Sequence, residues 1–189
     1  METKPILRDV PEQIETERLE LRLVTSGVGA RVNEAIVEST DELARYMPWA
    51  QPCPSPSDTE EWCRQVHAKF IRREELHYHF YLKPDGAFAG SIGLFRIDWG
   101  VPKGELGYWT RTSLAGRGYM CEAVRGLSNV AFAQLGFERL EIRCEDGNVR
   151  SARVAERCGY TLDALLRRHA RAADGSLRDD RLYSMLRPS

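Results

Sequence analysis

A glycine-rich loop stands directly before an amphipathic segment in the middle of the chain. The loop is Ala115-Gly116-Arg117-Gly118, and apolar residues then recur at helical spacing from Ala123 to Ala131. Glycines let a backbone approach a ligand closely, and the first turn of a helix offers unpaired N–H groups at the positive end of the helix dipole. An anion such as a pyrophosphate fits that arrangement. Taken alone, the triplet also fits plain turn chemistry, since it is neither a Walker A loop nor a full GxGxxG fingerprint.

Further segments of distinctive sequence stand in order around this loop. They are Arg18-Leu19-Glu20-Leu21-Arg22, Tyr46-Met47-Pro48-Trp49 with Asp58-Thr59-Glu60, Glu105-Leu106-Gly107-Tyr108-Trp109 followed by Gly116 to Met120 and Glu122-Ala123, and Asn148-Val149-Arg150-Ser151 with Val154 and Glu156 to Tyr160. Together they resemble the GNAT superfamily of N-acetyltransferases. Within it they resemble the RimJ/RimL branch, the ribosomal-protein N-terminal acetyltransferases and their relatives. The resemblance extends from about Thr16 to Leu186.

The resemblance implies a fold, a reaction and a cofactor site. The fold is the α/β GNAT fold, a central mixed and mostly antiparallel sheet flanked by helices in a single domain. The reaction transfers an acetyl group from acetyl-CoA to a primary amine and needs no metal. The residues expected to contact acetyl-CoA are Leu106, Gly107, Tyr108, Trp109, Thr110, Arg117, Gly118, Tyr119, Met120, Asn148 and Arg157.

The chain departs from the superfamily pattern at three positions. Ala115 stands where the loop commonly has Gln or Arg, and Met120 takes its last small position. Many members carry a proton-donating Tyr seven residues after the Asn, where this chain has Ala155. In the RimL-like pattern a Ser three residues after the Asn takes that place, and Ser151 matches it.

Acyl transfer from a thioester to an amine needs a base, an oxyanion donor and protonation of the leaving thiolate. Glu105 is the one acidic residue of the expected cofactor strand, so we expect it to be the base, acting through water. A solvent-facing strand carboxylate is the alternative. Gly107 predicts a bulge that opens the ladder and leaves an oxyanion donor nearby. Ser151 would donate to the sulfur, or else serve as a helix-capping hydroxyl.

The acceptor is less well defined by the sequence. Trp49 lies in a proline-rich loop and is expected to form a wall of the acceptor site, or alternatively to close the core. A protein α-amine has a pKa near 7.7–8.0 against 10.4 for lysine, so deprotonating it at pH 7 costs about 3 kcal/mol less. This favours a peptide N-terminus. A small amine such as a polyamine, antibiotic or amino acid, and a non-catalytic acyl-CoA sensor, stay open as alternatives.

Two other groups of residues have side chains that could do chemistry, a pair of histidines and one cysteine. His77 and His79 share one strand face at a spacing that two metal ligands can use, but no third ligand stands nearby, so paired strand histidines are favoured over a metal site. Cys121 begins the helix after the glycine loop, where a thiolate is favoured. No positioned histidine accompanies it, so a small core residue is the better interpretation, and direct attack is expected rather than a covalent enzyme intermediate.

Hydrophobic patterning predicts the elements that must hold these residues. Strands are expected at residues 19–23, 77–82, 87–97, 105–110, 140–144, 160–166 and 181–186, with turns at Lys83-Pro84-Asp85-Gly86 and Asp174-Gly175. Helices are expected at 30–39, with a shorter one after Thr40 or Asp41, at 57–73 behind a Ser57/Glu60 capping box, at 119–135, and at 148–158.

Length and composition bound the remaining possibilities. With 189 residues, 42% hydrophobic and 29% charged, the chain has the size of one domain. We expect residues 1–15 to form a loose leader and 16–189 the acetyltransferase domain. A net charge of −1 gives no case for nucleic acid or an anionic membrane as a partner. Five cysteines without CxxC spacing predict a reduced, cytoplasmic protein, and the resemblance implies a homodimer.

Overall fold

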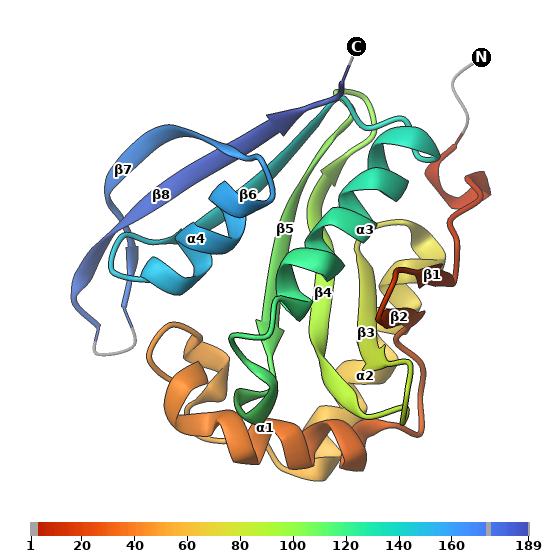
Figure 1. Ribbon diagram of the computed structural model, residues 1–189, viewed down its shortest axis with the longest axis vertical. Helices are drawn as coiled ribbons and strands as arrows, with labels where there is room; N and C mark the ends of the chain where they lie inside the picture. Colours follow the sequence, from red (N-terminus) through yellow and green to blue (C-terminus); the bar gives the residue numbers. More distant parts are fainter. Residues whose placement is uncertain (1–3, 173–174, 189) are drawn as a thin grey trace.

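Apolar residues at alternate positions build a sheet of eight strands in the computed structural model, which describes residues 4–172 and 175–188. The spatial order is β1-β2-β3-β4-β5-β6-β8-β7 (Figure 1). The strands are β1 (Gln13–Glu15), β2 (Leu19–Leu23), β3 (Leu76–Leu82), β4 (Phe88–Asp98), β5 (Lys103–Thr110), β6 (Arg139–Glu145), β7 (Thr161–Arg171) and β8 (Leu177–Leu186).

The pairing of β5 with β6 gives the sheet its functional shape. Within the described ranges it is the one parallel pair, and its register runs from Lys103↔Arg139 to Leu106↔Ile142. Beyond Leu106 the two strands separate, while β5 stays paired with β4 as far as Thr110 (Figure 1). Alternate backbone groups of residues 107–110 therefore face the gap rather than a neighbouring strand.

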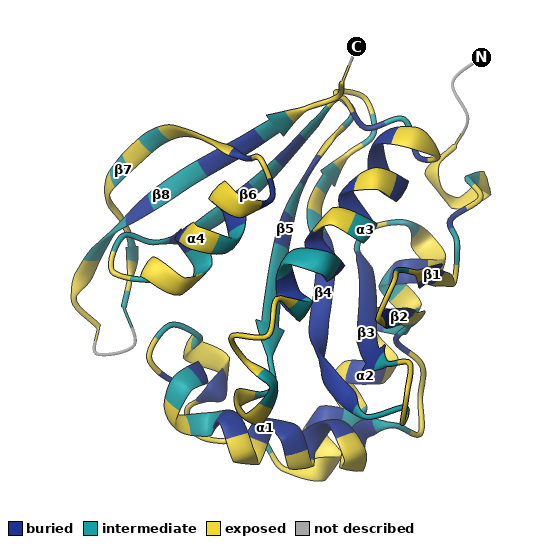
Figure 2. Ribbon diagram, viewed as in Figure 1, coloured by how far each residue is buried: buried dark blue, intermediate teal, exposed yellow. Residues whose placement is uncertain are grey.

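In the described part of the chain, four α-helices cover the two faces of the sheet: α1 (Gly29–Leu43), α2 (Pro56–Arg72), α3 (Tyr119–Ala133) and α4 (Val149–Arg157). Short 3₁₀ turns lie at η1 (Pro5–Leu7), η2 (Pro48–Ala50) and η3 (Thr112–Leu114). The main core joins α3 and α4 to inward residues of the strands, including Leu94, Leu106 and Ile142. A second cluster joins α1 to Tyr81 and Phe88. Figure 2 shows that β3 and most of β4 are buried, whereas β7 is largely exposed.

The structure confirms the α/β fold class with its mostly antiparallel sheet and the β3–β4 turn at Lys83 to Gly86, and it corrects several boundaries. α1 is one helix through Thr40, whose Oγ1 donates back to the carbonyl of Ile36 at 2.9 Å instead of capping a new helix. The capping box of α2 is Ser55 with Asp58, not Ser57 with Glu60, because Pro56 takes the first helical position. β7 and β8 are longer than expected, and Asp174 of the expected turn lies outside the described residues.

Part of the segment expected to be a loose leader belongs to the sheet. Gln13–Glu15 pair with β2, and Val10 and Ile14 are buried in the main core. The packed domain therefore begins before residue 16.

The bulge expected at Gly107 is absent. The β4–β5 register passes through Gly93↔Gly107 without interruption, and the shift in this pair lies between Phe95 and Asp98. A Cβ on Gly107 would lie 2.5 Å from the ring of Phe95. Glycine is therefore needed at this position because the Phe95 ring packs over it, and not because the strand bulges there. The opening of the ladder lies on the β6 side of β5 instead.

Candidate active site

A cleft of about 560 Å³ fills the gap where β5 and β6 diverge; we call it the interstrand cleft. It is bounded by the end of β5, the loop and start of α3, the first turns of α4 and the end of α1. Expected cofactor residues that line it are Tyr108, Trp109, Thr110, Gly118, Tyr119, Met120, Asn148 and Arg157, and Ser151 lines it as well.

The start of α3 gives this cleft its anion-binding character. Gly116 and Gly118 have φ of +77° and +83°, and Gly118 is the N-cap of the helix. Left-handed backbone at these two positions turns the loop into α3, whose first N–H groups have no acceptor within the helix. The negatively charged end of a ligand is therefore stabilised at this corner.

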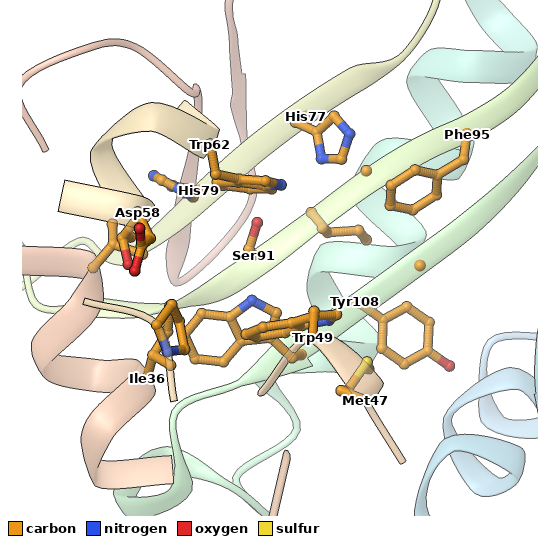
Figure 3. A pocket seen from close by; sticks show the side chains of 17 residues that line it. Ile36, Met47, Trp49, Asp58, Trp62, His77, His79, Ser91, Phe95 and Tyr108 are labelled. Atoms are coloured by element: carbon orange, nitrogen blue, oxygen red, sulfur yellow. The ribbon is translucent and has the colours of Figure 1, made fainter. Parts of the chain in front are cut away.

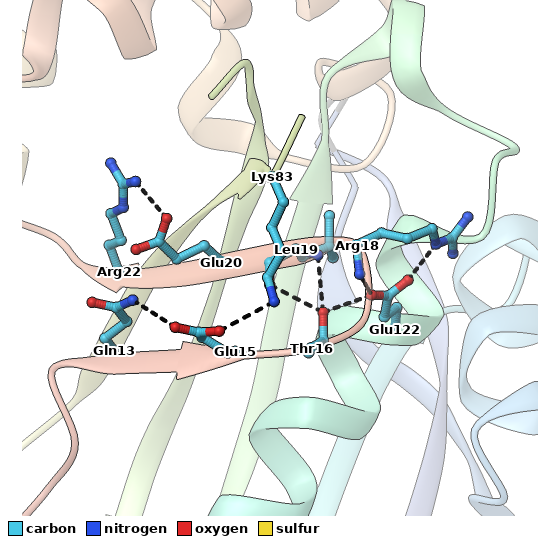
Figure 4. Close-up of polar contacts among 9 residues, drawn as sticks. All are labelled: Gln13, Glu15, Thr16, Arg18, Leu19, Glu20, Arg22, Lys83 and Glu122. Atoms are coloured by element: carbon cyan, nitrogen blue, oxygen red, sulfur yellow. Dashed lines mark hydrogen bonds and ion pairs between the residues drawn. The ribbon is translucent and has the colours of Figure 1, made fainter. Parts of the chain in front are cut away.

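Glu122 fixes that corner to the N-terminal strands. Its carboxylate accepts hydrogen bonds from Thr16 Oγ1 at 2.6 Å and from the Arg18 backbone N–H at 2.7 Å, and it pairs with Arg18 Nε at 2.7 Å (Figure 4). Arg18 Nη1 also donates to the carbonyl of Arg117 at 3.1 Å. Burial works against the charge of Glu122, but these hydrogen bonds outweigh it and lower its pKa. The hydrogen bonds and ion pair of Arg18 and Glu122 thus fix the position of the glycine loop.

Three arginines of α4 add positive charge to the other side of the cleft. Arg150 pairs with Glu42 at 2.7 Å, across the mouth of the cleft. Arg153 and Arg157 line the cleft as well, and neither has an ion-pair partner in the described part of the chain. Free guanidinium groups of this kind suit phosphate groups.

The residue that caps α4 is Asn148 and not Ser151. Asn148 is the N-cap of α4, and its Oδ1 accepts from the Ser151 backbone N–H at 3.1 Å. The Ser151 hydroxyl is thereby left for the cleft, where it lies 3.1 Å from the hydroxyl of Tyr108. Burial raises the pKa of Tyr108, which keeps its proton on the oxygen. Two hydroxyls therefore stand in series at the wall of the cleft.

A second cavity of about 390 Å³, the ring-lined cavity, adjoins the first on the α1 and α2 side of the sheet. Trp49, Trp62 and Phe95 lie around it (Figure 3). Met47, Tyr108 and Trp109 line both cavities, so the two meet at the end of β5. A group held at the meeting point would be reachable from both sides.

Two buried histidines of β3, His77 and His79, belong to the wall of the ring-lined cavity. Nε2 of His77 lies 2.9 Å from Glu75 Oε2. His79 is 1% exposed, and its Nε2 has no hydrogen-bond partner within residues 4–172 and 175–188. Burial, reinforced by the neighbouring His77, lowers the pKa of His79 to about 3. No set of three metal-ligating side chains is found among the described residues.

The remaining expected site residues lie outside the interstrand cleft. Gly107 and Trp49 line the ring-lined cavity. Leu106 points into the main core, and Arg117 is exposed with only its carbonyl seen in a contact. Glu105 lines neither cavity; its carboxylate pairs with Arg96 at 2.6 Å and with Arg143 of β6. The contribution of Glu105 to the reaction stays a prediction.

Residue patterns alone missed several side chains of the site. The pattern predicts Tyr108 as a cofactor contact but does not indicate its hydroxyl contact with Ser151, nor the cleft-lining arginines at 150 and 153. An i, i+3 spacing of Arg150 and Arg153 on one helix, with Arg157 one turn later, was the available signal for the last group.

Comparison with known proteins gives one consistent result. A family model described as an acetyltransferase (GNAT) domain matches residues 18–161. YdaF of Bacillus subtilis (strain 168), named as a ribosomal N-acetyltransferase, is 29% identical over 177 residues, which cover 90% of this chain and 92% of YdaF. The ribosomal-protein-serine acetyltransferase of Escherichia coli (strain K12) is 27% identical over 172 residues, covering 90% of this chain and 94% of that protein.

Solved structures agree in fold. The microcin C7 self-immunity acetyltransferase MccE, in complex with acetyl-CoA and AMP, superposes with a TM-score of 0.86 at 22% identity, over 94% of this chain and 97% of that one. RimL, the ribosomal L7/L12 alpha-N-protein acetyltransferase in complex with coenzyme A, gives a TM-score of 0.86 at 22% identity, over 93% and 98%. The family model covers well over half of the sequence, so this chain belongs to the GNAT acetyltransferase family, as an enzyme that transfers the acetyl group of acetyl-CoA to an amine.

Proposed function

We propose that this enzyme acetylates the N-terminal α-amine of a protein or peptide by direct attack on the thioester of acetyl-CoA. The observation that carries the proposal is the junction of the two cavities at Met47, Tyr108 and Trp109. Acetyl-CoA occupies the interstrand cleft, with its phosphates at the start of α3 and beside Arg153 and Arg157. The acceptor enters through the ring-lined cavity, so that amine and thioester meet at the end of β5.

The step joins the amine nitrogen to the thioester carbonyl carbon and breaks the carbon–sulfur bond. The amine loses one proton and the departing thiolate gains one. Backbone groups of residues 107–110 that face the cleft orient the acetyl arm and stabilise the oxyanion. Ser151 donates to the sulfur, with the Tyr108 hydroxyl behind it at 3.1 Å. Glu105 accepts the amine proton through water.

Two considerations support an α-amine over the amine of a lysine. The α-amine needs about 3 kcal/mol less to lose its proton at pH 7, which suits a site whose candidate carboxylate lines neither cavity. Relatives named as a ribosomal N-acetyltransferase and a ribosomal-protein-serine acetyltransferase match nine-tenths of the chain.

The proposal is tested by thiol release from acetyl-CoA with two sets of acceptors. One set holds peptides with varied first residues, each beside a copy whose α-amine is blocked; the other holds polyamines, aminoglycosides and free amino acids. We expect turnover with peptides that stops when the α-amine is blocked. Turnover with the small amines alone would replace the proposal by the small-molecule function. Acetyl-CoA binding without turnover on either set would indicate a sensor.

The base is tested separately with Glu105→Gln. We expect kcat to fall more than tenfold while the Kd for acetyl-CoA is unchanged, because the carboxylate takes a proton and does not hold the cofactor. Glu141→Gln is the matched control, since Glu141 is the register partner of Glu105 on β6 and is itself paired with an arginine at 2.7 Å. Full activity of Glu105→Gln would remove Glu105 from the mechanism.

Assembly and location are part of the same proposal. We expect a homodimer, and the outer strand β7 carries Leu162 and Leu165 about half exposed, as an edge that a second copy can cover. Light scattering of the purified protein tests this, and a monomer at micromolar concentration would contradict it. A cytoplasmic location is supported by cysteines that form no disulfide among themselves. None of the helices in the described ranges combines the length and apolar character needed to cross a membrane.

A further inference from the structure

The accessible side chains in the wall of the ring-lined cavity are mostly apolar. Trp49 and Trp62 line it and are 46% and 37% exposed, which is unusual for side chains of this size. Met47, Phe95 and Trp109 line it as well and are partly exposed (Figure 3). These side chains, rather than the buried ones behind them, would meet whatever occupies the cavity.

The polar side chains deeper in the wall are out of reach. A set of them is 5% exposed or less: Thr59, His77, His79 and Ser91. The hydroxyl of Ser91 donates to the carbonyl of Tyr78 at 3.2 Å, and that of Thr59 donates to the carbonyl of Ser55 at 3.0 Å. Nε2 of His79 is buried behind the stacked ring of Trp62. None of these groups is available to bond a polar acceptor side chain.

The charges around the cavity do not suit a charged acceptor side chain either. No lysine or arginine of the described residues lines it. Asp58 does, and its Oδ2 accepts from the hydroxyl and the backbone N–H of Ser55 at 2.7 and 2.9 Å. These hydrogen bonds lower the pKa of Asp58, so its carboxylate is ionised at neutral pH and repels an acidic side chain. Any charged side chain would also lose its water on entering a cavity walled by rings.

The size and position of the cavity suit a side chain next to the reacting amine. Its volume of about 390 Å³ lies within the range of about 300–1,000 Å³ found for small-molecule sites. It meets the interstrand cleft at Met47, Tyr108 and Trp109, where the proposed reaction takes place. An apolar group in the cavity and the rings around it are removed from water together, and this burial favours binding.

We propose that the acceptor carries a large apolar side chain next to its amine, of the leucine, methionine or phenylalanine type, and that this side chain fills the ring-lined cavity. The proposal rests on the N-terminal acetylation proposed above and names the acceptor class for it. Trp62 of α2 contacts the acceptor side chain and is a specificity-determining residue. The acetyl transfer itself takes place at the junction beside Tyr108.

The test compares peptides that are identical except for a first residue of Leu, Phe, Ser, Lys or Asp, by kcat/KM from thiol release. We expect the Leu and Phe peptides to exceed the Ser peptide by about tenfold or more, because a large apolar side chain gains from burial what serine cannot. The Lys and Asp peptides should fall below Ser, because a charge must leave water. Phenethylamine against ethanolamine makes the same comparison for free amines.

Variants on α2 assign the preference to Trp62. Trp62→Arg places a guanidinium in the wall, so the ratio of kcat/KM for the Asp peptide to that for the Leu peptide should rise by about tenfold or more. Trp62→Phe keeps a ring and should keep the wild-type order. Ile71→Arg is the matched control, since Ile71 lies on the same helix, is 49% exposed and lines neither cavity. Its order of acceptors should equal that of the wild type.

The outcomes separate this proposal from the function beneath it. Equal kcat/KM for the Leu and Ser peptides, or a preference for Ser, Lys or Asp, overturns the acceptor class and leaves N-terminal acetylation intact. Transfer to phenethylamine but to no peptide overturns the N-terminal function and keeps the apolar preference. An unchanged order of acceptors in Trp62→Arg overturns the role of Trp62. If that variant does not fold, Trp62→Gln decides the same point, since loss of the ring should lower the Leu/Ser ratio.

Discussion

Tyr108 lies in the wall that both cavities share, with its hydroxyl 3.1 Å from Ser151 Oγ. The sequence pattern indicated Ser151 and Asn148 because their spacing resembles a known motif. It did not indicate the hydroxyl of Tyr108 as a partner, since 43 residues separate Tyr108 from Ser151 and no periodicity relates them.

The hydroxyl pair predicts a shared effect on the leaving thiolate. Tyr108→Phe should lower kcat about tenfold and leave the KM for acetyl-CoA nearly unchanged, because proton donation at a reacting atom is worth roughly 10²–10⁴-fold and the outer hydroxyl supplies only part of it. Ser151→Ala should cost more. The loss of kcat in the double variant should be smaller than the product of the two single losses, since the two groups act in series. Independent, multiplicative losses would show that the pair does not act as one unit.

At the scale of elements, the sequence predicted which segments form helices and strands better than where they begin. Ser57 with Glu60 and Ser55 with Asp58 both have capping-box spacing, and the proline between the two serines decides for Ser55. The short strand β1 has only three residues, too few for an alternating pattern to be recognised. The gap between β5 and β6 could not be predicted from either strand alone, because it depends on where their pairing stops.

The start of α3 gives a prediction at this scale. Gly118→Ala places a Cβ at φ +83°, where the left-handed backbone costs an L-residue about 1–2 kcal/mol. We expect the Kd for acetyl-CoA to rise several-fold and Tm to fall by about 2–8 °C. Gly136→Ala is the control, since Gly136 follows the same helix at φ +75° with open space around its Cβ position and lies outside both cavities. Its Tm should fall similarly with no change in Kd, whereas weakened cofactor binding in both variants would point to a general loss of α3.

For the whole molecule, carboxylates whose pKa is lowered by folding set the response to acid. Hydrogen bonds from Arg111 lower the pKa of Glu38 on α1 to about 2, and the contact with His77 does the same for Glu75. Glu38 thereby fastens α1 to the turn η3 just before the glycine loop, with a further bond from the Ser113 N–H at 3.0 Å. A pKa lowered by folding means that the stabilisation is full above the ordinary value of 4.5. It is lost as the pH falls from there towards about 2.

Thermal unfolding measured from pH 7 to pH 3 tests this. Tm of the wild type should be steady down to about pH 5 and then fall. Glu38→Gln should lower Tm at pH 7 by about 2–4 °C, because it removes a charged hydrogen bond worth roughly 1 kcal/mol after allowance for its partial exposure. Below pH 5, the Tm of this variant should fall less steeply than the Tm of the wild type. Glu34→Gln is the control, since Glu34 lies on the same helix and has no ion-pair partner among the described residues. Identical pH profiles for Glu38→Gln and the wild type would contradict the assignment.

Met47, Tyr108 and Trp109 belong to both cavities, and this has a consequence for how the two substrates are measured. A ligand on one side fixes side chains that the other ligand must also contact, so the two binding free energies are coupled, and such coupling is reciprocal. Bound acetyl-CoA should raise the affinity of the enzyme for its acceptor. A bound acceptor should raise the affinity for acetyl-CoA by the same factor. An acceptor profile recorded without the cosubstrate therefore describes a different surface from the one that selects the amine during turnover.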